Sequence, residues 1–230
     1  MLRSTTGFLA GAAALMLAMG TARAEIPNNT LKLGVLTDLS GFAADSTGPG
    51  SVAAAKLAIE DFHKEKPDIK IELIQGDHQN KADIGGTLAR RWIDVDKVDA
   101  ILDVPFSSVA LAVQEVVRGS KAAFIASGPG TSLLTGEKCS PNTVQWSYDT
   151  WSLAHGTALA LLRAKKDTWF FVTADYAFGH SLEHDAAAVV KAEGGKVLGS
   201  VRHPTGTADF SSFLLQAQAS KAKVVALANA

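Results

Sequence analysis

The chain has 230 residues, of which 47% are hydrophobic, enough for the core of a globular protein. Its 22 basic and 23 acidic residues give a formal net charge of −1 at pH 7, which argues against a nucleic-acid-binding protein, since such proteins usually present a basic face. The single cysteine, Cys139, cannot form a disulfide within the chain. It is therefore either buried and inert or paired with a thiol outside this sequence.

The first 24 residues have the organisation of a secretory signal peptide. Arg3 supplies the positive start, an apolar run follows over residues 8–19, and Ala22-Arg23-Ala24 gives the small-x-small cleavage pattern. The apolar run has about a dozen residues, fewer than the roughly 20 that a membrane-spanning helix requires. We expect a mature chain that begins at Glu25 in the periplasm; the alternative is an uncleaved anchor.

Strand and helix patterns alternate along the rest of the chain. Short apolar or alternating runs predict strands at 32–37, 70–75, 100–104, 122–126, 168–173, 196–202 and 224–227. Apolar residues at helical spacing predict helices at 52–62, 81–95, 109–117, 150–164, 179–193 and 209–220. This order is typical of an α/β protein with parallel sheets.

A long irregular stretch at 127–147, rich in Gly and Pro, interrupts the alternation. A connection of this length is uncommon inside a compact domain and is usually functional or inter-domain. We expect it to join two doubly wound parallel-sheet lobes, an amino-terminal lobe at 25–143 and a second lobe at 144–230, with a ligand cleft between them. Because the sequence ends on a strand pattern, the second lobe is expected to be incomplete.

Polar and aromatic residues follow the predicted strands, and ligands of open parallel sheets bind beyond the carboxyl ends of the strands. Phe106, Ser107 and Ser108 come after the strand at 100–104 and lead directly into a helix. Free N–H groups at a helix start favour an anion such as a carboxylate. The residues alone leave two readings of these serines about equal, an anion site and a simple N-cap.

The next strand is followed by Ser127-Gly128-Pro129-Gly130-Thr131. Glycine lacks a Cβ, so backbone N–H groups in such a loop can approach a ligand closely; the alternative is a plain turn. Tyr148, Trp151, Tyr176 and Phe178 are able to form the walls of an apolar cleft, although each taken singly is more typical of a core residue.

Motifs for cofactors and catalysis are missing from the sequence. We find no G-x-G-x-x-G after the first strand, no G-x-x-x-x-G-K-[ST] and no G-x-S-x-G. His180 and His184 are four residues apart, but without an H-E-x-x-H pattern they do not predict a metal site. His78 follows a strand and is expected to be a solvated loop residue. We therefore expect no cofactor and no metal, and an exported α/β enzyme is the weaker alternative.

Segments spread over the whole mature chain are similar to one family, in order and at fitting spacing. Residues 32–62 resemble the opening of type I periplasmic solute-binding proteins, the leucine/isoleucine/valine-binding family that serves ABC transporters. The segments DVPFSSVALAVQEV, FIASGPGTSLLTG, FFVTADYAFGHSL and DFSSFLLQAQASKAKVVAL resemble later parts of the same family. The resemblance implies two lobes that close on a small solute around a hinge.

The resemblance also implies roles for individual residues. A serine after the third strand binds the ligand carboxylate in this family, which assigns that role to Ser107. Groups after the fourth strand complete this contact, a set that corresponds here to Ser127, Gly128, Gly130 and Thr131. An aromatic residue of the second lobe packs on the ligand, and Phe178 or Tyr176 occupies that position.

Other family features concern the class of ligand. Members that bind amino acids hold the ammonium with an acidic residue further along, beyond the end of this sequence. The loop before the first helix often carries a Tyr or another aromatic residue, and here only Phe42 fits that position. Together with Phe106 and Tyr148, it leads to the hypothesis of an aromatic or bulky acid as the ligand.

The function that the resemblance implies is solute capture for import. The protein is expected to bind a small organic solute, an amino acid or an aromatic or other carboxylic acid, and to deliver it to an inner-membrane ABC permease without making or breaking a bond. A ligand-sensing module for a membrane receptor would share the same sequence pattern and stays open as an alternative.

Overall fold

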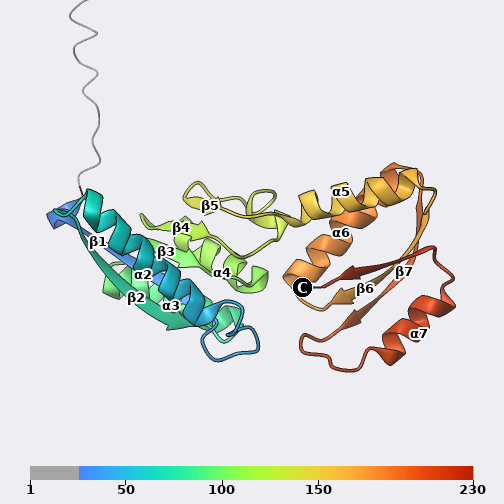
Figure 1. The fold of residues 1–230 in the computed structure, drawn as a ribbon, viewed down its shortest axis with the longest axis horizontal. Coiled ribbons are helices and arrows are strands. Elements are labelled where there is room, and N and C mark those ends of the chain that lie inside the picture. The colour runs from blue at the N-terminus through green and yellow to red at the C-terminus, as the bar shows by residue number, and fades with distance from the viewer. Residues whose placement is uncertain (1–25, 230) are drawn as a thin grey trace, which may run out of the picture.

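The computed structural model describes residues 26–229, so the predicted signal peptide lies outside the described residues. Within that range no helix combines the length and the apolar character needed to cross a membrane. The described chain forms two lobes that lie side by side along the long axis of the molecule (Figure 1).

The elements fall into two groups. The first group comprises a 3-10 turn η1 (Pro27–Asn29), β1 (Thr30–Thr37), α2 (Gly48–Glu65), β2 (Lys70–Asp77), α3 (Ala82–Arg91), a π-helical turn η2 (Trp92–Asp96), β3 (Ala100–Asp103), α4 (Ser107–Arg118), β4 (Ala123–Ala126), a 3-10 turn η3 (Ser132–Leu134) and β5 (Thr143–Gln145). The second group comprises α5 (Thr150–Arg163), β6 (Thr168–Ala174), α6 (Ala177–Ala192), β7 (Lys196–His203), α7 (Ser211–Ala219) and β8 (Val224–Ala228).

Each lobe is built on one parallel sheet. The strand order is β2-β1-β3-β4-β5 in the first lobe and β7-β6-β8 in the second. Every strand pair is parallel, with a helix in most of the connections between successive strands, which confirms the predicted α/β fold class. The sheets place the carboxyl ends of their strands toward the junction of the lobes, where a ligand of an open α/β sheet binds.

One strand, β5, was missed in the stretch for which an irregular connection was expected. Its three residues pair with β4, from Phe124↔Thr143 to Ala126↔Gln145. Three residues are too few to show an alternating pattern in the sequence, so this strand depends on the hydrogen bonds that β4 offers rather than on its own composition.

The core of the first lobe lies between its sheet and helices α3 and α4. Val109, Val113 and Val117 of α4 are four residues apart and fully buried, as expected for one face of a helix. They join Ile101 and Phe124 of the sheet in one hydrophobic cluster. The apolar face that the sequence predicted for this helix is therefore its contact with the sheet.

In the second lobe, alternate residues of β6 pack on opposite faces of the sheet. Trp169 and Phe171 contact the residues of α5 and α6, whereas Phe170 and Val172 contact Ala217 of α7. A strand covered on both faces has no polar face, which explains why the run TWFFVT is apolar at successive positions.

Candidate functional site

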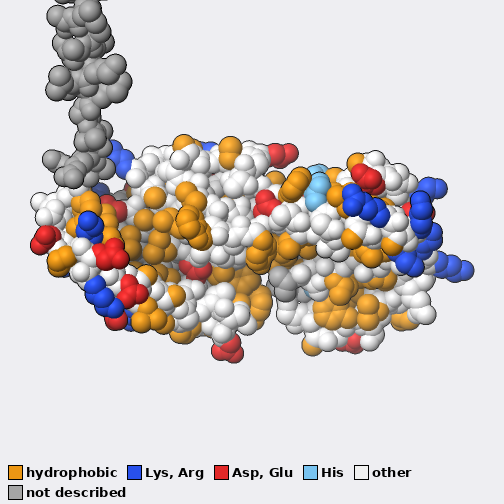
Figure 2. Space-filling view, turned by 45° about the horizontal axis from the view of Figure 1, so that its top comes forward, with side chains coloured by type: hydrophobic (Ala, Val, Ile, Leu, Met, Phe, Trp, Pro, Cys, Tyr) orange, Lys and Arg blue, Asp and Glu red, His pale blue; other side chains and the backbone are white. Residues whose placement is uncertain are grey.

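A cavity of about 500 Å³ lies between the two lobes. The loops that line it follow the carboxyl ends of strands from both sheets, and Figure 2 shows the indentation between the lobes on the surface. The lining residues are Phe42, Ala43, Ser46, Thr47, Pro105, Phe106, Ser107, Gly128, Gly130, Tyr148, Ala174, Tyr176, Phe178, His203, Thr205, Gly206, Thr207, Phe210 and Asn229. The volume lies within the range of small-molecule binding sites, about 300–1,000 Å³.

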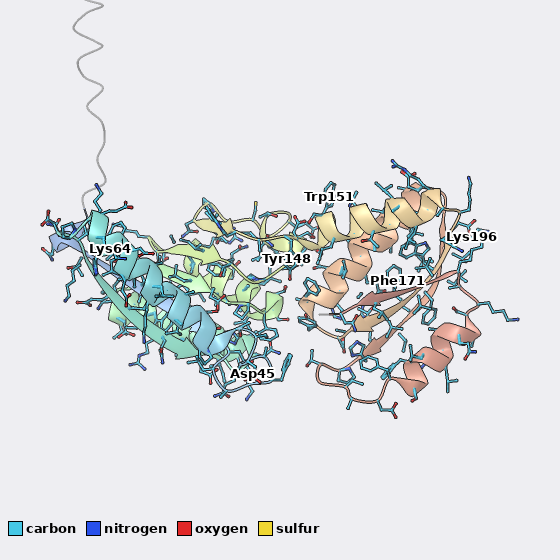
Figure 3. The ribbon with its side chains drawn as sticks, in the orientation of Figure 1. Asp45, Lys64, Tyr148, Trp151, Phe171 and Lys196 are labelled. Atoms are coloured by element: carbon cyan, nitrogen blue, oxygen red, sulfur yellow. The ribbon has the colours of Figure 1, made fainter. Side chains whose placement is uncertain are left out.

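Most of the residues singled out in the sequence line this cavity. Those on its wall are Phe106, Ser107, Gly128, Gly130, Tyr148, Tyr176 and Phe178. They come from four segments that are far apart in the sequence, and Tyr148 lies at the junction of the two lobes (Figure 3).

Four other singled-out residues lie outside the cavity wall. Trp151, expected to be able to form part of the wall, is 54% exposed and stacks on His155 instead. The remaining three have hydroxyl side chains. Ser108 Oγ accepts from the backbone N–H of Ala177 in the second lobe at 3.2 Å. Ser127 Oγ donates to Asp103 Oδ1 at 3.1 Å. Thr131 is fully buried, with Oγ1 2.6 Å from Ser181 Oγ on α6. In the structure, Ser108 and Thr131 therefore contact the opposite lobe, and Ser127 contacts the end of β3.

Ser107 begins α4 and is 1% exposed. Its Oγ accepts a hydrogen bond from the backbone N–H of Thr131 at 3.2 Å, which leaves the hydroxyl hydrogen free to donate. The N-cap residue, Phe106, makes no side-chain capping bond, so it satisfies none of the first N–H groups of α4. This end of the cavity thus offers hydrogen-bond donors and the positive end of a helix dipole to an anion.

The turn between β3 and α4 has an unusual backbone. Asp103 and Val104 have φ values of 77° and 55°, in the left-handed region. This region is rarely adopted by a β-branched residue, and such positions cost on the order of 1–3 kcal/mol each. Val104 is fully buried and its N–H donates to the carbonyl of Leu36 at 2.9 Å, so the surrounding core holds the turn in place. This conformation directs the chain from β3 into the start of α4.

Aromatic rings form the walls of the cavity on both sides. Phe42 and Phe106 of the first lobe pack edge to face with centroids 5.4 Å apart. Tyr176 and Phe178 of the second lobe lie 6.1 Å apart at an interplanar angle of 29°. Burial and, to a lesser degree, the nearby Tyr148 raise the pKa of Tyr176 to about 12, so its phenol stays protonated at neutral pH.

The cavity wall is poor in charged residue types over the part of the chain that the structure describes. Among residues 26–229, those that line it include no Asp, Glu, Lys or Arg. Its polar groups are hydroxyls, one imidazole, one carboxamide and backbone groups. This arrangement suits a ligand with an aromatic or apolar body and a few hydrogen-bonding ends.

Sequence reasoning missed the residues that β7 and β8 contribute to the wall. His203 is the last residue of β7, Thr205, Gly206, Thr207 and Phe210 follow that strand, and Asn229 follows β8. The sequence did contain a signal for this loop. The run HPTGT follows a predicted strand and has the same mixture of polar residues and glycine as the run SGPGT after β4. The rule that located the other loops also applied to this one.

The structure overturns the expectation for His78 and removes one of the two readings of Cys139. His78, expected to be a solvated loop residue, is fully buried, with Nδ1 accepting from the N–H of Asn80 and its ring edge-on to Phe106 at 5.8 Å. Burial lowers the pKa of His78, while the nearby carboxylates oppose that shift. Cys139 is exposed, which removes the reading of a buried thiol.

The two histidines of α6 belong to a separate surface region. His180 Nε2 lies 2.8 Å from Asp175 Oδ1 and forms a pair with that carboxylate. In the part of the chain that the structure describes, no three His, Cys, Asp or Glu side chains gather in a group able to hold a metal ion.

Known proteins of similar sequence and structure share this architecture. A family model described as periplasmic binding protein matches residues 30–230. A periplasmic binding protein from Burkholderia mallei is 48% identical, with a TM-score of 0.83 over 88% of this chain and 54% of the other. A branched chain amino acid ABC transporter periplasmic ligand-binding protein from Burkholderia xenovorans LB400 is 38% identical, with a TM-score of 0.69 over 85% of this chain and 52% of the other.

A third solved structure is an ABC transporter solute binding protein from R. palustris in complex with 4-hydroxybenzoate. It is 25% identical, with a TM-score of 0.72 over 86% of this chain and 53% of that protein. The chain thus spans about half the length of the solved structures that it matches. A comparison with curated proteins found no match. From the family match over residues 30–230 and the two-lobed α/β fold, the chain belongs to the periplasmic binding protein family, in agreement with the type I resemblance of its segments.

Proposed function

We propose that this protein captures a small carboxylic acid between its lobes in the periplasm and delivers it to the permease of an ABC importer. Membership of the periplasmic binding protein family and similarity to two ABC transporter components support this role. The amino-terminal signal pattern supports export. No step of the role makes or breaks a bond.

The observation that carries the proposal is the position of Ser107. It lies on the cavity wall at the start of α4, with its hydroxyl hydrogen free to donate. A ligand carboxylate placed here would accept from the hydroxyl and from N–H groups of the first helical turn. Charge-assisted hydrogen bonds of this kind are stronger than neutral ones, which gives the site a physical preference for acids.

We further propose an aromatic acid as the ligand. The rings of Phe42, Phe106, Tyr176 and Phe178 offer flat apolar surfaces on both sides of the cavity. The R. palustris relative, in complex with 4-hydroxybenzoate, supports this ligand class.

An amino acid is the second candidate, favoured by the Burkholderia xenovorans relative, which is described as part of a branched chain amino acid transporter. Either ligand would contact both lobes at once. A ligand that binds the closed arrangement more tightly than the open one shifts the equilibrium toward closure by that difference in affinity. The closed form is then the one that a permease would recognise.

Calorimetric titration of the full-length protein tests both parts of the proposal. The panel contains benzoate, 4-hydroxybenzoate, leucine, valine and phenylalanine. Binding of the aromatic acids without leucine or valine supports an aromatic acid, whereas binding of leucine or valine alone assigns the amino-acid class. Absence of binding to every member contradicts the proposed ligand classes.

The variant Ser107→Ala tests the carboxylate site. It should weaken the binding of an acid by about 1–3 kcal/mol, because one hydrogen bond to a charged group is lost. Ser212→Ala, on the exposed side of α7, is the matched control and should leave affinity unchanged. Unchanged affinity in Ser107→Ala, with an unaltered melting temperature, removes Ser107 from the site.

A further inference from the structure

The loop between β1 and α2, residues 38–47, forms part of the cavity wall without any helix or strand of its own. Four of its residues line the cavity, namely Phe42, Ala43, Ser46 and Thr47. Phe42 is 64% exposed, and its ring meets that of Phe106 edge to face. The place of this ring on the wall therefore depends on the backbone conformation of the loop.

Asp38, at the start of the loop, is fully buried. Its Oδ1 accepts from the backbone N–H of Gly41 at 2.7 Å, and its Oδ2 accepts from the backbone N–H of Ala43 at 3.2 Å. These two N–H groups lie on either side of Phe42. A buried carboxylate is costly unless it is hydrogen-bonded, and bonds to a charged acceptor are stronger than neutral ones. The carboxylate thus holds the backbone on both sides of Phe42.

The loop fits closely around this carboxylate. A Cβ at Gly41 would lie 2.5 Å from both side-chain oxygens of Asp38, so a residue without a side chain is needed there. Asp77, at the end of β2, holds the start of the loop by accepting from the N–H of Leu39 at 3.0 Å. The conformation of the loop is therefore set by side chains at the ends of two neighbouring strands.

We infer that Asp38 is a positioning residue, which holds Phe42 on the cavity wall and so sets the affinity for the solute. The inference rests on the proposed function, since the bound solute must contact Phe42. Asp38 is not among the cavity-lining residues of the described chain. Its effect on binding should therefore pass through Phe42.

Hydrogen exchange tests the first half of the inference and needs no ligand. In the full-length protein, the amide hydrogens of Gly41 and Ala43 should be protected. In Asp38→Asn, at least one of them should exchange about ten-fold faster, the factor expected when a hydrogen bond to a charged acceptor is lost. Amides of the β1 strand should keep their exchange rates, because the sheet is unaltered.

A double-mutant cycle tests the second half, by calorimetric titration of the full-length protein with 4-hydroxybenzoate. Phe42→Ala should weaken binding about ten-fold through the loss of a ring contact. Asp38→Asn should weaken binding about five-fold alone, but less than about two-fold in Phe42→Ala, because the ring that it positions is then absent. A general effect on folding would give the same factor in both backgrounds.

The matched control is Asp45→Asn, an exposed aspartate of the same loop that does not line the cavity (Figure 3). This variant should leave both exchange and affinity unchanged. If Asp38→Asn does not fold, Gly41→Ala takes its place in both experiments, because the added methyl group displaces the same carboxylate.

The outcomes separate this inference from the proposed function. Unaltered exchange of Gly41 and Ala43, or equal factors in the two backgrounds, overturns the role of Asp38 and leaves the proposed function standing. If the protein binds leucine and no aromatic acid, the aromatic-acid class fails, and the same cycle with leucine supports or overturns the role of Asp38. If no solute of the panel binds, the proposed function fails and the inference fails with it.

Discussion

The backbone of Gly130 in the loop after β4 packs directly against the ring of Phe178 at the start of α6. A Cβ at position 130 would lie 2.7 Å from Phe178 Cε2 and 3.0 Å from Tyr148 Cε2. Both distances are shorter than ordinary contacts between carbon atoms, which are about 3.5–4.0 Å. The missing side chain is therefore what allows an aromatic residue of the second lobe to reach the backbone of the first.

Substitution of Gly130 by alanine should disturb this contact between the lobes. The added methyl group displaces the rings of Phe178 and Tyr148, and overpacking of this kind costs about 1–3 kcal/mol. Because both rings line the cavity, we also expect weaker ligand binding. Urea unfolding and calorimetric titration measure the two effects.

Gly156→Ala is the control for this substitution. Gly156 lies within α5, and a Cβ there would meet nothing within 4 Å. Alanine is favoured over glycine in a helix by about 1 kcal/mol, so this variant should be neutral or more stable. Unaltered stability and affinity in Gly130→Ala would show that the contact with Phe178 is dispensable.

Asp185 of α6 accepts hydrogen bonds from two hydroxyl groups, that of Ser132 in the first lobe and that of Thr150 at the start of α5 in the second lobe. Its Oδ2 accepts from Ser132 Oγ at 2.9 Å and from Thr150 Oγ1 at 2.7 Å. Thr150 is fully buried, so its hydroxyl loses its acceptor in Asp185→Ala. We expect the free energy of unfolding to fall by about 1–3 kcal/mol in chemical denaturation.

The matched control is Asp68→Ala, in an exposed turn before β2. Exposed substitutions away from special features usually change stability by less than about 0.5 kcal/mol. The proposed role of Asp185 would be wrong if both variants unfolded at the same denaturant concentration. The proposed role of Asp185 would also lose support if Ser132→Ala left the free energy of unfolding unchanged.

Burial of His78 predicts a dependence of stability on pH. Its pKa in the folded state is lowered below the ordinary 6.5 chiefly by burial, so protonation favours the unfolded chain. The contribution of His78 to stability is thus present above the unfolded pKa and is lost as the pH falls through the folded pKa. Unfolding free energy should decrease on going from about pH 7.5 to about pH 5.5.

His78→Asn tests the origin of this decrease. The side-chain oxygen of asparagine can accept from the N–H of Asn80 in place of Nδ1, but it does not titrate in this range. We expect a smaller loss of stability between the two pH values in the variant, measured by urea unfolding. An equal loss in both proteins would place the titration at another group.

Strand ends were predictable from the sequence, and with them most of the cavity wall. Phe106 and Gly128 directly follow apolar strand runs, and the local pattern is sufficient to place them at the carboxyl ends of parallel strands. The buried face of α4 was equally evident, because Val109, Val113 and Val117 recur at helical spacing. The same pattern did not distinguish Ser107, on the wall, from Ser108, which contacts the second lobe.

The sequence by itself thus determined the alternating elements, the fold class and the loops that meet between the lobes, since these depend on periodicity and on the residues at strand ends. Only the tertiary structure decided that His78 is buried, that Ser107 instead of Ser108 lines the cavity and that Val104 adopts φ 55°. Each of these depends on packing between segments distant in the chain. A single local pattern cannot specify such packing, because it is the neighbouring elements that supply the contacts.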